Sequence, residues 1–322
     1  MNKRYPWMKT NMLLMLFIIV SCAPAAPAGQ DPEKLTVSVS ILPQKYFVER
    51  IGGEWVDVNV MVGPGDSPHS YEPRASQMTA LSASDVYFTI GVEFEDAWMD
   101  RIASANPDMP IVDLTQEIDL IKDTDHHHAN EDTDYEEHDE DELDHEDHEG
   151  EESHHDETDH AEEMDPHIWT SPANGAMIAD RIAATLIDLD PQHAANYQEN
   201  LDTFQSDIEQ LQSDIRAALD DLDTREFMVF HPAWGYFAQE FNLQQIPIEI
   251  AGSEPSAAEL AGLIESALAE NITVIFAQPE FSTRSADYIA SEIGGQVILI
   301  SPLAENWLEN LRLVAQTFAE EL

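Results

Sequence analysis

Short apolar and β-branched runs alternate with stretches of helical spacing along both halves of the chain. In the first half these patterns predict strands at residues 35–40, 55–62, 86–90 and 111–114. In the second half they predict strands at residues 227–230, 246–250, 274–277 and 297–300. Helical spacing predicts helices at residues 42–51, 232–241, 257–269, 285–293 and 306–320. This alternation indicates an α/β fold with a mostly parallel sheet, flanked by helices, in each half.

The middle of the chain carries two long helical patterns. The first covers residues 173–189, and the second follows it and is amphipathic. Apolar positions of the second recur every three or four residues, at Leu201, Phe204, Ile208, Leu211, Ile215, Leu219 and Leu222. A helix of about 30 residues is roughly 45 Å long, which is enough to join two lobes. We therefore predict an N-terminal lobe over residues 35–190, a linking helix over 191–222 and a C-terminal lobe over 223–322.

The composition changes abruptly after residue 122. Residues 123–165 hold 23 acidic residues, nine histidines and no lysine or arginine. Such a segment has too few apolar side chains to form a core of its own, so we expect a disordered surface insertion over residues 123–164. Its histidines are His126, His127, His128, His138, His145, His148, His154, His155 and His160.

The chain is acidic well beyond this insertion. It has 64 acidic and 14 basic residues, for a formal net charge of -50. Without the 23 acidic residues of residues 123–165 the charge is still -27. Negative charge of this size repels nucleic acid and anionic surfaces, so we exclude nucleic-acid binding and expect cations as partners.

The N-terminus has the pattern of an export signal. Three basic residues precede an apolar run at residues 12–20, which is too short to span a bilayer. The run continues into Ile-Val-Ser-Cys22, which resembles the lipobox of bacterial lipoproteins, where the cysteine carries the lipid. We expect a signal peptide over residues 1–21, lipidation of Cys22 and a tether over residues 22–34. A plain secretory signal with a buried cysteine is the alternative. Cys22 is the only cysteine, which excludes thiolate metal sites.

Four of the 13 histidines lie outside the insertion, at positions 69, 167, 193 and 231. His69, His167 and His231 each adjoin a proline near the end of a predicted strand or the start of a helix. Ligands of α/β sheets bind beyond the carboxyl ends of the strands, and proline restricts the backbone beside it. A single histidine in a loop is usually a surface or core residue, but three imidazoles can hold zinc with one position open. We predict that these three bind a metal and that His193 is an ordinary exposed residue.

These segments together resemble the cluster 9 (ZnuA-like) solute-binding proteins, the zinc- and manganese-binding components of ABC importers. The resemblance extends from about residue 35 to the C-terminus. It rests on Pro-His-Ser-Tyr-Glu-Pro at 68–73, Asp-Pro-His-Ile-Trp at 165–169 and His-Pro-Ala-Trp-Gly-Tyr-Phe at 231–237. Glu-Pro-Ser-Ala-Ala-Glu-Leu at 254–260 and Ile-Phe-Ala-Gln-Pro-Glu-Phe at 275–281 add to it.

The resemblance implies an exported protein that is not an enzyme. It would be a lipid-anchored monomer, at the outer face of the bacterial cytoplasmic membrane or in the periplasm. It would bind zinc with high affinity in a cleft between the lobes and deliver the ion to a membrane permease of an ABC importer. In this family His69 and His167 would come from the N-terminal lobe and His231 from the C-terminal lobe, and the long helix would limit closure of the lobes.

The fourth ligand is open. The family often has an acidic residue after the last strand, where this chain has Ser301. An un-ionised hydroxyl is a poor zinc ligand, so water or a carboxylate such as Glu72 would take the position. Gln-Pro-Glu at 278–280 stands where Glu-Pro-Gln is commoner, which makes Glu280 another candidate.

The ligand set favours zinc over manganese, because manganese prefers more oxygen ligands than three imidazoles leave room for. Relatives selective for manganese tend to have glutamate in place of His231, and His-rich insertions are associated with zinc members. We expect the nine histidines of the insertion to bind further ions weakly and concentrate them near the cleft. A sensor, a segment that passes zinc to another protein, and a solvated acidic tract are the alternatives.

Two other functions suit three histidines. A zinc hydrolase also uses three protein ligands and an open position. However, the chain has no His-Glu-x-x-His motif, and Glu72 is the candidate general base. The other is a zinc-binding adhesin, or a periplasmic zinc chaperone or buffer, on the same fold. Dependence of zinc uptake on a partner permease would separate these from a transport component.

Overall fold

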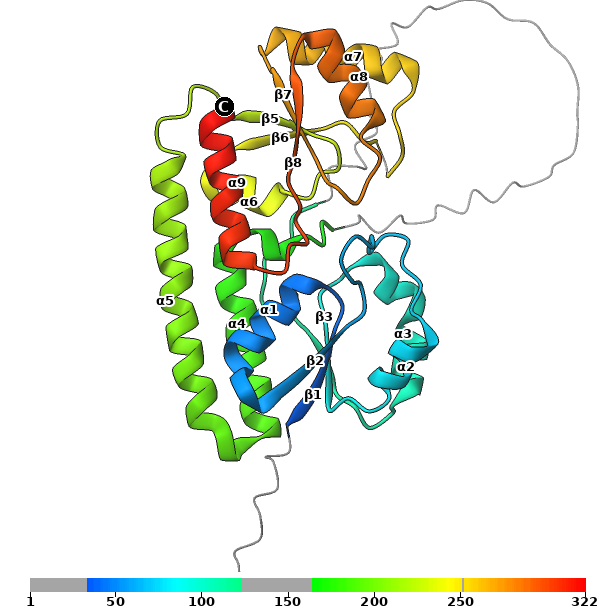
Figure 1. Cartoon of the computed structure of the whole chain (residues 1–322), viewed down its shortest axis with the longest axis vertical. Coiled ribbons are helices and arrows are strands. Elements are labelled where there is room, and N and C mark those ends of the chain that lie inside the picture. The colour runs from blue at the N-terminus through cyan, green and yellow to red at the C-terminus, as the bar shows by residue number, and fades with distance from the viewer. Residues whose placement is uncertain (1–33, 123–163, 251) are drawn as a thin grey trace, which may run out of the picture. The chain divides into compact units, whose positions relative to one another are not determined.

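Two four-stranded parallel sheets form the framework of the protein (Figure 1). The computed structural model describes residues 34–122, 164–250 and 252–322. The first sheet has the order β2-β1-β3-β4, with β1 at Leu35–Val39, β2 at Val56–Val60, β3 at Val86–Thr89 and β4 at Ile111–Asp113. The second has the order β6-β5-β7-β8, with β5 at Glu226–Val229, β6 at Gln244–Pro247, β7 at Val274–Ala277 and β8 at Gln296–Leu299. The predicted α/β fold with two lobes is confirmed.

Helices connect the strands in each lobe. Those of the N-terminal lobe are α1 at Leu42–Gly52, α2 at Ala75–Leu81 and α3 at Glu93–Ala105. Those of the C-terminal lobe are α6 at Gly235–Phe241, α7 at Ala257–Ala269, α8 at Arg284–Ile293 and α9 at Trp307–Glu321. Strands β3 and β7 are buried at every position, as expected for parallel strands covered by helices on both faces.

Two long helices occupy the middle of the chain, α4 at Pro172–Leu189 and α5 at Ala194–Ala218. A short 3₁₀ turn, η4 at Pro191–His193, separates them. The long helix is therefore shorter than its predicted span of residues 191–222, and at its end the Leu219 N–H bonds the Ile215 carbonyl. Its 25 residues correspond to roughly 37 Å.

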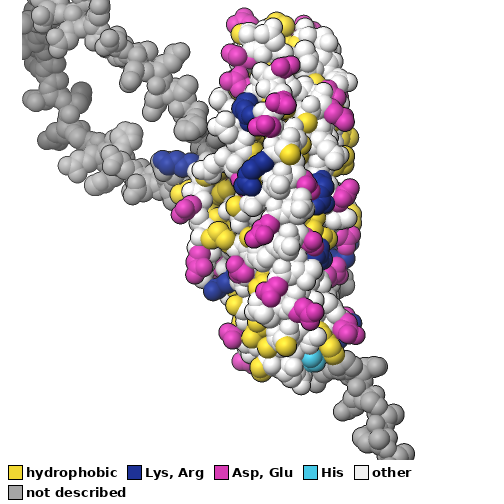
Figure 2. All heavy atoms as spheres, turned by 90° about the vertical axis from the view of Figure 1, so that its left-hand side faces the viewer, with side chains coloured by type: hydrophobic (Ala, Val, Ile, Leu, Met, Phe, Trp, Pro, Cys, Tyr) yellow, Lys and Arg dark blue, Asp and Glu magenta, His cyan; other side chains and the backbone are white. Residues whose placement is uncertain are grey.

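Helix α5 packs against helices of both lobes. It contacts α1 of the N-terminal lobe and α9 of the C-terminal lobe, as well as α4. Arg50 of α1 pairs with Asp207 at 2.6 Å, and Arg312 of α9 pairs with Asp214 at 3.0 Å. The face over α5 carries acidic side chains along its length with basic ones between them (Figure 2). Such surface pairs contribute at most about 1 kcal/mol each, so the buried apolar face of α5 dominates this packing.

Two elements of the C-terminal lobe differ from their predicted ranges by more than one residue. Strand β6 covers Gln244–Pro247 rather than residues 246–250, because an edge strand tolerates the polar Gln244 and Gln245 at its start. Helix α6 begins at Gly235, and Pro232 is not its first residue. Gln245 holds the turn before α6, since it accepts from the Trp234 N–H at 3.1 Å and donates to the Pro232 carbonyl at 3.2 Å.

Helix α7 begins at the predicted residue, 257. Its start is stabilised by a capping box, formed by Ser256 and Glu259.

Several predicted features lie outside the described residues. They are the signal peptide, the tether with Cys22 up to residue 33, and residues 123–163 of the acidic insertion with its nine histidines. Within residues 34–122, 164–250 and 252–322, no helix combines the length and the apolar composition that crossing a bilayer requires.

Candidate metal centre

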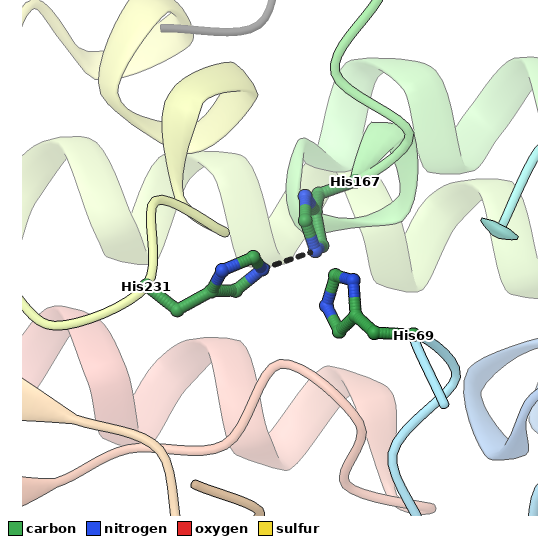
Figure 3. Close-up of side chains that lie close together, drawn as sticks. All are labelled: His69, His167 and His231. Carbon is green, nitrogen blue, oxygen red and sulfur yellow. Dashed lines mark hydrogen bonds between the residues drawn. The ribbon is translucent and has the colours of Figure 1, made fainter. Parts of the chain in front are cut away.

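Three histidines from distant parts of the sequence lie together (Figure 3). His69 lies in the loop that follows β2, and His231 lies just after β5. His167 immediately precedes η3, a 3₁₀ turn at Ile168–Thr170 that leads into α4. One ring nitrogen of each residue lies within 4.8 Å of the others, and the Nε2 atoms of His167 and His231 are 3.3 Å apart. Three nitrogen donors at this spacing can converge on one ion.

Each imidazole has a carboxylate at its Nδ1 atom. Glu93 of α3 lies 2.6 Å from Nδ1 of His69, and Asp165 lies 2.7 Å from Nδ1 of His167. Glu249, in the loop after β6, lies 2.8 Å from Nδ1 of His231. A neutral imidazole carries one N–H, so donation from Nδ1 to the carboxylate leaves the Nε2 lone pair for a metal. The three carboxylates also bring negative charge to the site without occupying a ligand position.

Burial and charge favour the metal-binding forms of these groups. Burial lowers the pKa of His231 below its ordinary value, the Glu249 hydrogen bond opposes this, and His167 and His69 lower it further. Metal binding requires the neutral imidazole, so His231 is ready to bind at neutral pH. Burial raises the pKa of Glu93, but its hydrogen bond and charge interaction with His69 outweigh burial and lower the pKa to about 2.

Aromatic rings contact each of the three histidines. The ring of Phe281 stacks on that of His231, with centroids 4.8 Å apart, and lies 5.5 Å from that of His69. The Trp169 ring is 5.2 Å from that of His167, and its indole N–H donates to the Pro302 carbonyl. Exclusion of water by these rings strengthens electrostatic interactions inside the site.

Two of the sequence-predicted candidates for a fourth ligand, Glu72 and Glu280, are not in the group of described residues that meets the 4.8 Å spacing. Glu72 is exposed. The Ser301 hydroxyl donates to Oε1 of Glu280 at 2.7 Å, so these two bond each other. Within the described part of the chain, the group of potential ligands that meets the 4.8 Å spacing consists of the three histidines.

His193 is not the ordinary exposed residue that the sequence suggests. Its ring stacks on that of Trp55, with centroids 3.8 Å apart and planes 14° from parallel. Its Nδ1 atom lies 2.6 Å from the buried carboxylate of Asp190, which also accepts from the Tyr197 hydroxyl. The prediction is wrong on exposure, because Trp55 comes from a distant part of the chain and covers the ring.

Sequence patterns did not identify the partners of the three histidines. Asp165 stands two positions before His167 in the motif Asp-Pro-His, so its place in the sequence could have indicated that it pairs with this histidine. Glu93, Glu249 and Phe281 carry no comparable local signal. What they share is a position after the carboxyl end of a strand, namely β3, β6 and β7.

Known proteins resemble this chain over most of its length. Residues 37–321 match the family model described as ZnuA, zinc-uptake complex component A, periplasmic. The high-affinity zinc uptake system protein ZnuA of Bacillus subtilis (strain 168) is 28% identical over 89% of this chain and 88% of its own length.

Solved structures also resemble this chain over most of its length. A crystal structure of ZnuA is 38% identical, with a TM-score of 0.77 over 90% of this chain and 99% of that one. A ZnuA deletion mutant with zinc bound is also 38% identical, with a TM-score of 0.76 over 90% of this chain and 98% of that one. The chain therefore belongs to the ZnuA family of periplasmic zinc-uptake components.

Proposed function

We propose that this protein is the extracytoplasmic zinc-binding component of an ABC importer, which captures Zn²⁺ and delivers it to a membrane permease. The observation that carries the proposal is the cluster of His69, His167 and His231, each with a carboxylate at Nδ1. The family is described as a component of a zinc-uptake complex. A site of three imidazoles suits zinc better than manganese, which prefers oxygen ligands.

The proposal has three finer parts, of which the first two rest on the sequence. The protein is exported through its N-terminal signal and anchored as a monomer by lipid on Cys22. The histidines of the insertion hold further ions weakly and keep them near the cleft. A water molecule completes the coordination of zinc, since Glu72 is exposed and Glu280 and Ser301 bond each other.

Zinc content and competitive zinc affinity of the full chain test this function. We expect one tightly bound zinc ion per chain, retained after deletion of residues 123–163 and lost in His231→Ala. The loss should exceed the roughly 10–100-fold effect typical of residues that only support a ligand. His193→Ala is the matched control, because His193 is a partly buried histidine with a carboxylate partner outside the cluster. Tight zinc binding that is lost when the insertion is deleted but is unchanged in His231→Ala would refute the three-histidine site.

Transport itself needs a cellular measurement. Zinc uptake by cells that express the chain should depend on a partner permease and on the three histidines. Uptake that is independent of any permease would favour a zinc buffer or an adhesin instead.

A further inference from the structure

A tyrosine of the C-terminal lobe fastens the segment that carries His167. The Tyr236 hydroxyl donates to the Asp165 carbonyl at 2.8 Å and accepts from the Ile121 N–H at 3.2 Å. Tyr236 is 3% exposed, and its bond to the Asp165 carbonyl is buried. Its single hydroxyl thus joins α6 to two backbone positions that are far apart in sequence.

Those two positions belong to a pair of short segments, 121–122 and 164–165, which we call the neck. Lys122 and Met164 form an antiparallel bridge, and the Asp165 N–H donates to the Ile121 carbonyl at 3.0 Å. The neck therefore holds its own shape, and Tyr236 attaches it as a unit to α6.

Gly235, the first residue of α6, allows the neck to approach this closely. A Cβ atom at position 235 would lie 2.6 Å from Oδ2 of Asp165 and 3.0 Å from Cδ1 of Ile121. The shorter distance is one that real Cβ atoms essentially never show, and the longer one is tighter than most real Cβ contacts. Gly235 and Tyr236 thus form the surface on which the neck packs, which we call the seat. A larger residue at position 235 would clash with the neck.

The seat is connected directly to the metal centre. Oδ1 of Asp165 accepts from the His167 backbone N–H at 2.8 Å and lies 2.7 Å from Nδ1 of His167. His231 stands five positions before Tyr236, at the other end of the same turn. The short segment 231–236 therefore carries His231 and also contacts the segment that carries His167. The Nε2 atoms of these two histidines are 3.3 Å apart.

His69 is held differently. It lies on the N-terminal lobe and pairs with Glu93 of the same lobe. Contacts near α6 thus fix the distance between His167 and His231. The position of His69 depends instead on the first sheet and the loops that leave it.

We propose that Tyr236 is a positioning residue for the metal. By bonding both segments of the neck, its hydroxyl holds His167 beside His231. These two imidazoles are then already paired before the metal binds, and His69 supplies the third ligand. The inference rests on the proposed function, since it assumes that the three histidines bind the ion. Preassembly increases affinity because less conformational freedom is lost on binding.

The test compares Tyr236→Phe and Gly235→Ala with wild type in the full chain. Tyr197→Phe is the matched control, because its hydroxyl is also buried and donates to Asp190 at 2.8 Å, outside the cluster. Three quantities are measured: the zinc affinity by chelator competition, the visible spectrum of bound Co²⁺, and melting without metal. The Co²⁺ spectrum reports ligand geometry, which a loss of global stability alone would not change.

We expect Tyr236→Phe to weaken zinc binding about 10-fold, the lower end of the range for residues that orient a ligand, and to alter the Co²⁺ spectrum. Gly235→Ala should act in the same direction, and Tyr197→Phe should leave both readouts at wild-type values. The inference is overturned if the two neck variants bind zinc and Co²⁺ like wild type. An equal loss of affinity in Tyr197→Phe, with unchanged spectra throughout, would also overturn it. Absence of tight zinc binding in wild type would refute the proposed function instead.

Discussion

The carboxylate of Glu93, the first residue of α3, lies 2.6 Å from Nδ1 of His69, which lies in the loop that follows β2. The pKa of Glu93 is lowered to about 2, because its interactions with His69 outweigh the opposing effect of burial. Glu93 therefore stays ionised wherever an imidazole can bind a metal. An ion held by Nε2 of His69 would therefore bind an imidazole whose other ring nitrogen donates to a negatively charged group.

Removal of this charge should weaken zinc binding. Glu93→Gln keeps an oxygen that can accept from Nδ1 but carries no charge, so we expect roughly 10-fold lower zinc affinity. Competitive titration against a chelator at constant pH measures the effect. Glu72→Gln is the matched control, because Glu72 is exposed and lies outside the cluster, and it should bind zinc like wild type. Equal affinities in all three proteins would contradict a role for Glu93.

Zinc should stabilise the folded protein through the same three histidines. A ligand that binds only the folded state adds about 2.7 kcal/mol to the free energy of unfolding at 100 times its Kd. Denaturant unfolding with and without free zinc measures this difference. We expect His231→Ala to lose most of it, whereas an unchanged stabilisation would indicate that zinc binds elsewhere in the chain.

A buried carboxyl of α3 should make stability depend on pH. Glu95 is 3% exposed and accepts from the Ser40 hydroxyl and from the Ile90 and Gly91 N–H groups. Burial raises its pKa from 4.5 to about 7, although these hydrogen bonds oppose the shift. Between these two values the folded state keeps a proton that the unfolded state has lost. The free energy of unfolding therefore falls as the pH rises.

Glu95→Gln isolates this effect. Relative to the variant, wild type should lose up to about 1.4 kcal/mol of stability per pH unit between about pH 4.5 and 7. Denaturant unfolding in the presence of a chelator, at three pH values across this window, measures the two slopes. Parallel profiles would show that Glu95 does not hold a proton in this range.

Two glycines in helices should respond oppositely to alanine. At Gly175 of α4 a Cβ atom would lie 2.6 and 2.7 Å from two ring carbons of Trp307 on α9. We expect Gly175→Ala to destabilise the protein by about 1–3 kcal/mol, the usual cost of overpacking. At Gly262 of α7 a Cβ atom would meet nothing within 4 Å, and alanine is the better helix former by about 1 kcal/mol. Thermal or denaturant melting should rank Gly262→Ala at or above wild type and Gly175→Ala below it.

Most of the secondary structure could be read from the chain. Strands β1 and β7 and helix α7 agree with the predicted ranges to within one residue, because apolar periodicity and the Ser256 capping box are local features. The errors fall where tertiary contacts override local pattern. Gln245 holds the turn before α6 in a shape that delays the helix to Gly235.

Local pattern was enough to predict the α/β fold and to single out His69, His167 and His231, since residue type and neighbouring prolines are visible in any one segment. It could not predict the groups around these histidines, which are Glu93 at His69, Glu249 at His231 and the neck that packs on α6. Periodicity reports which face of an element is buried, whereas contacts between loops depend on strand order and on how helices pack, and neither leaves a trace in local spacing.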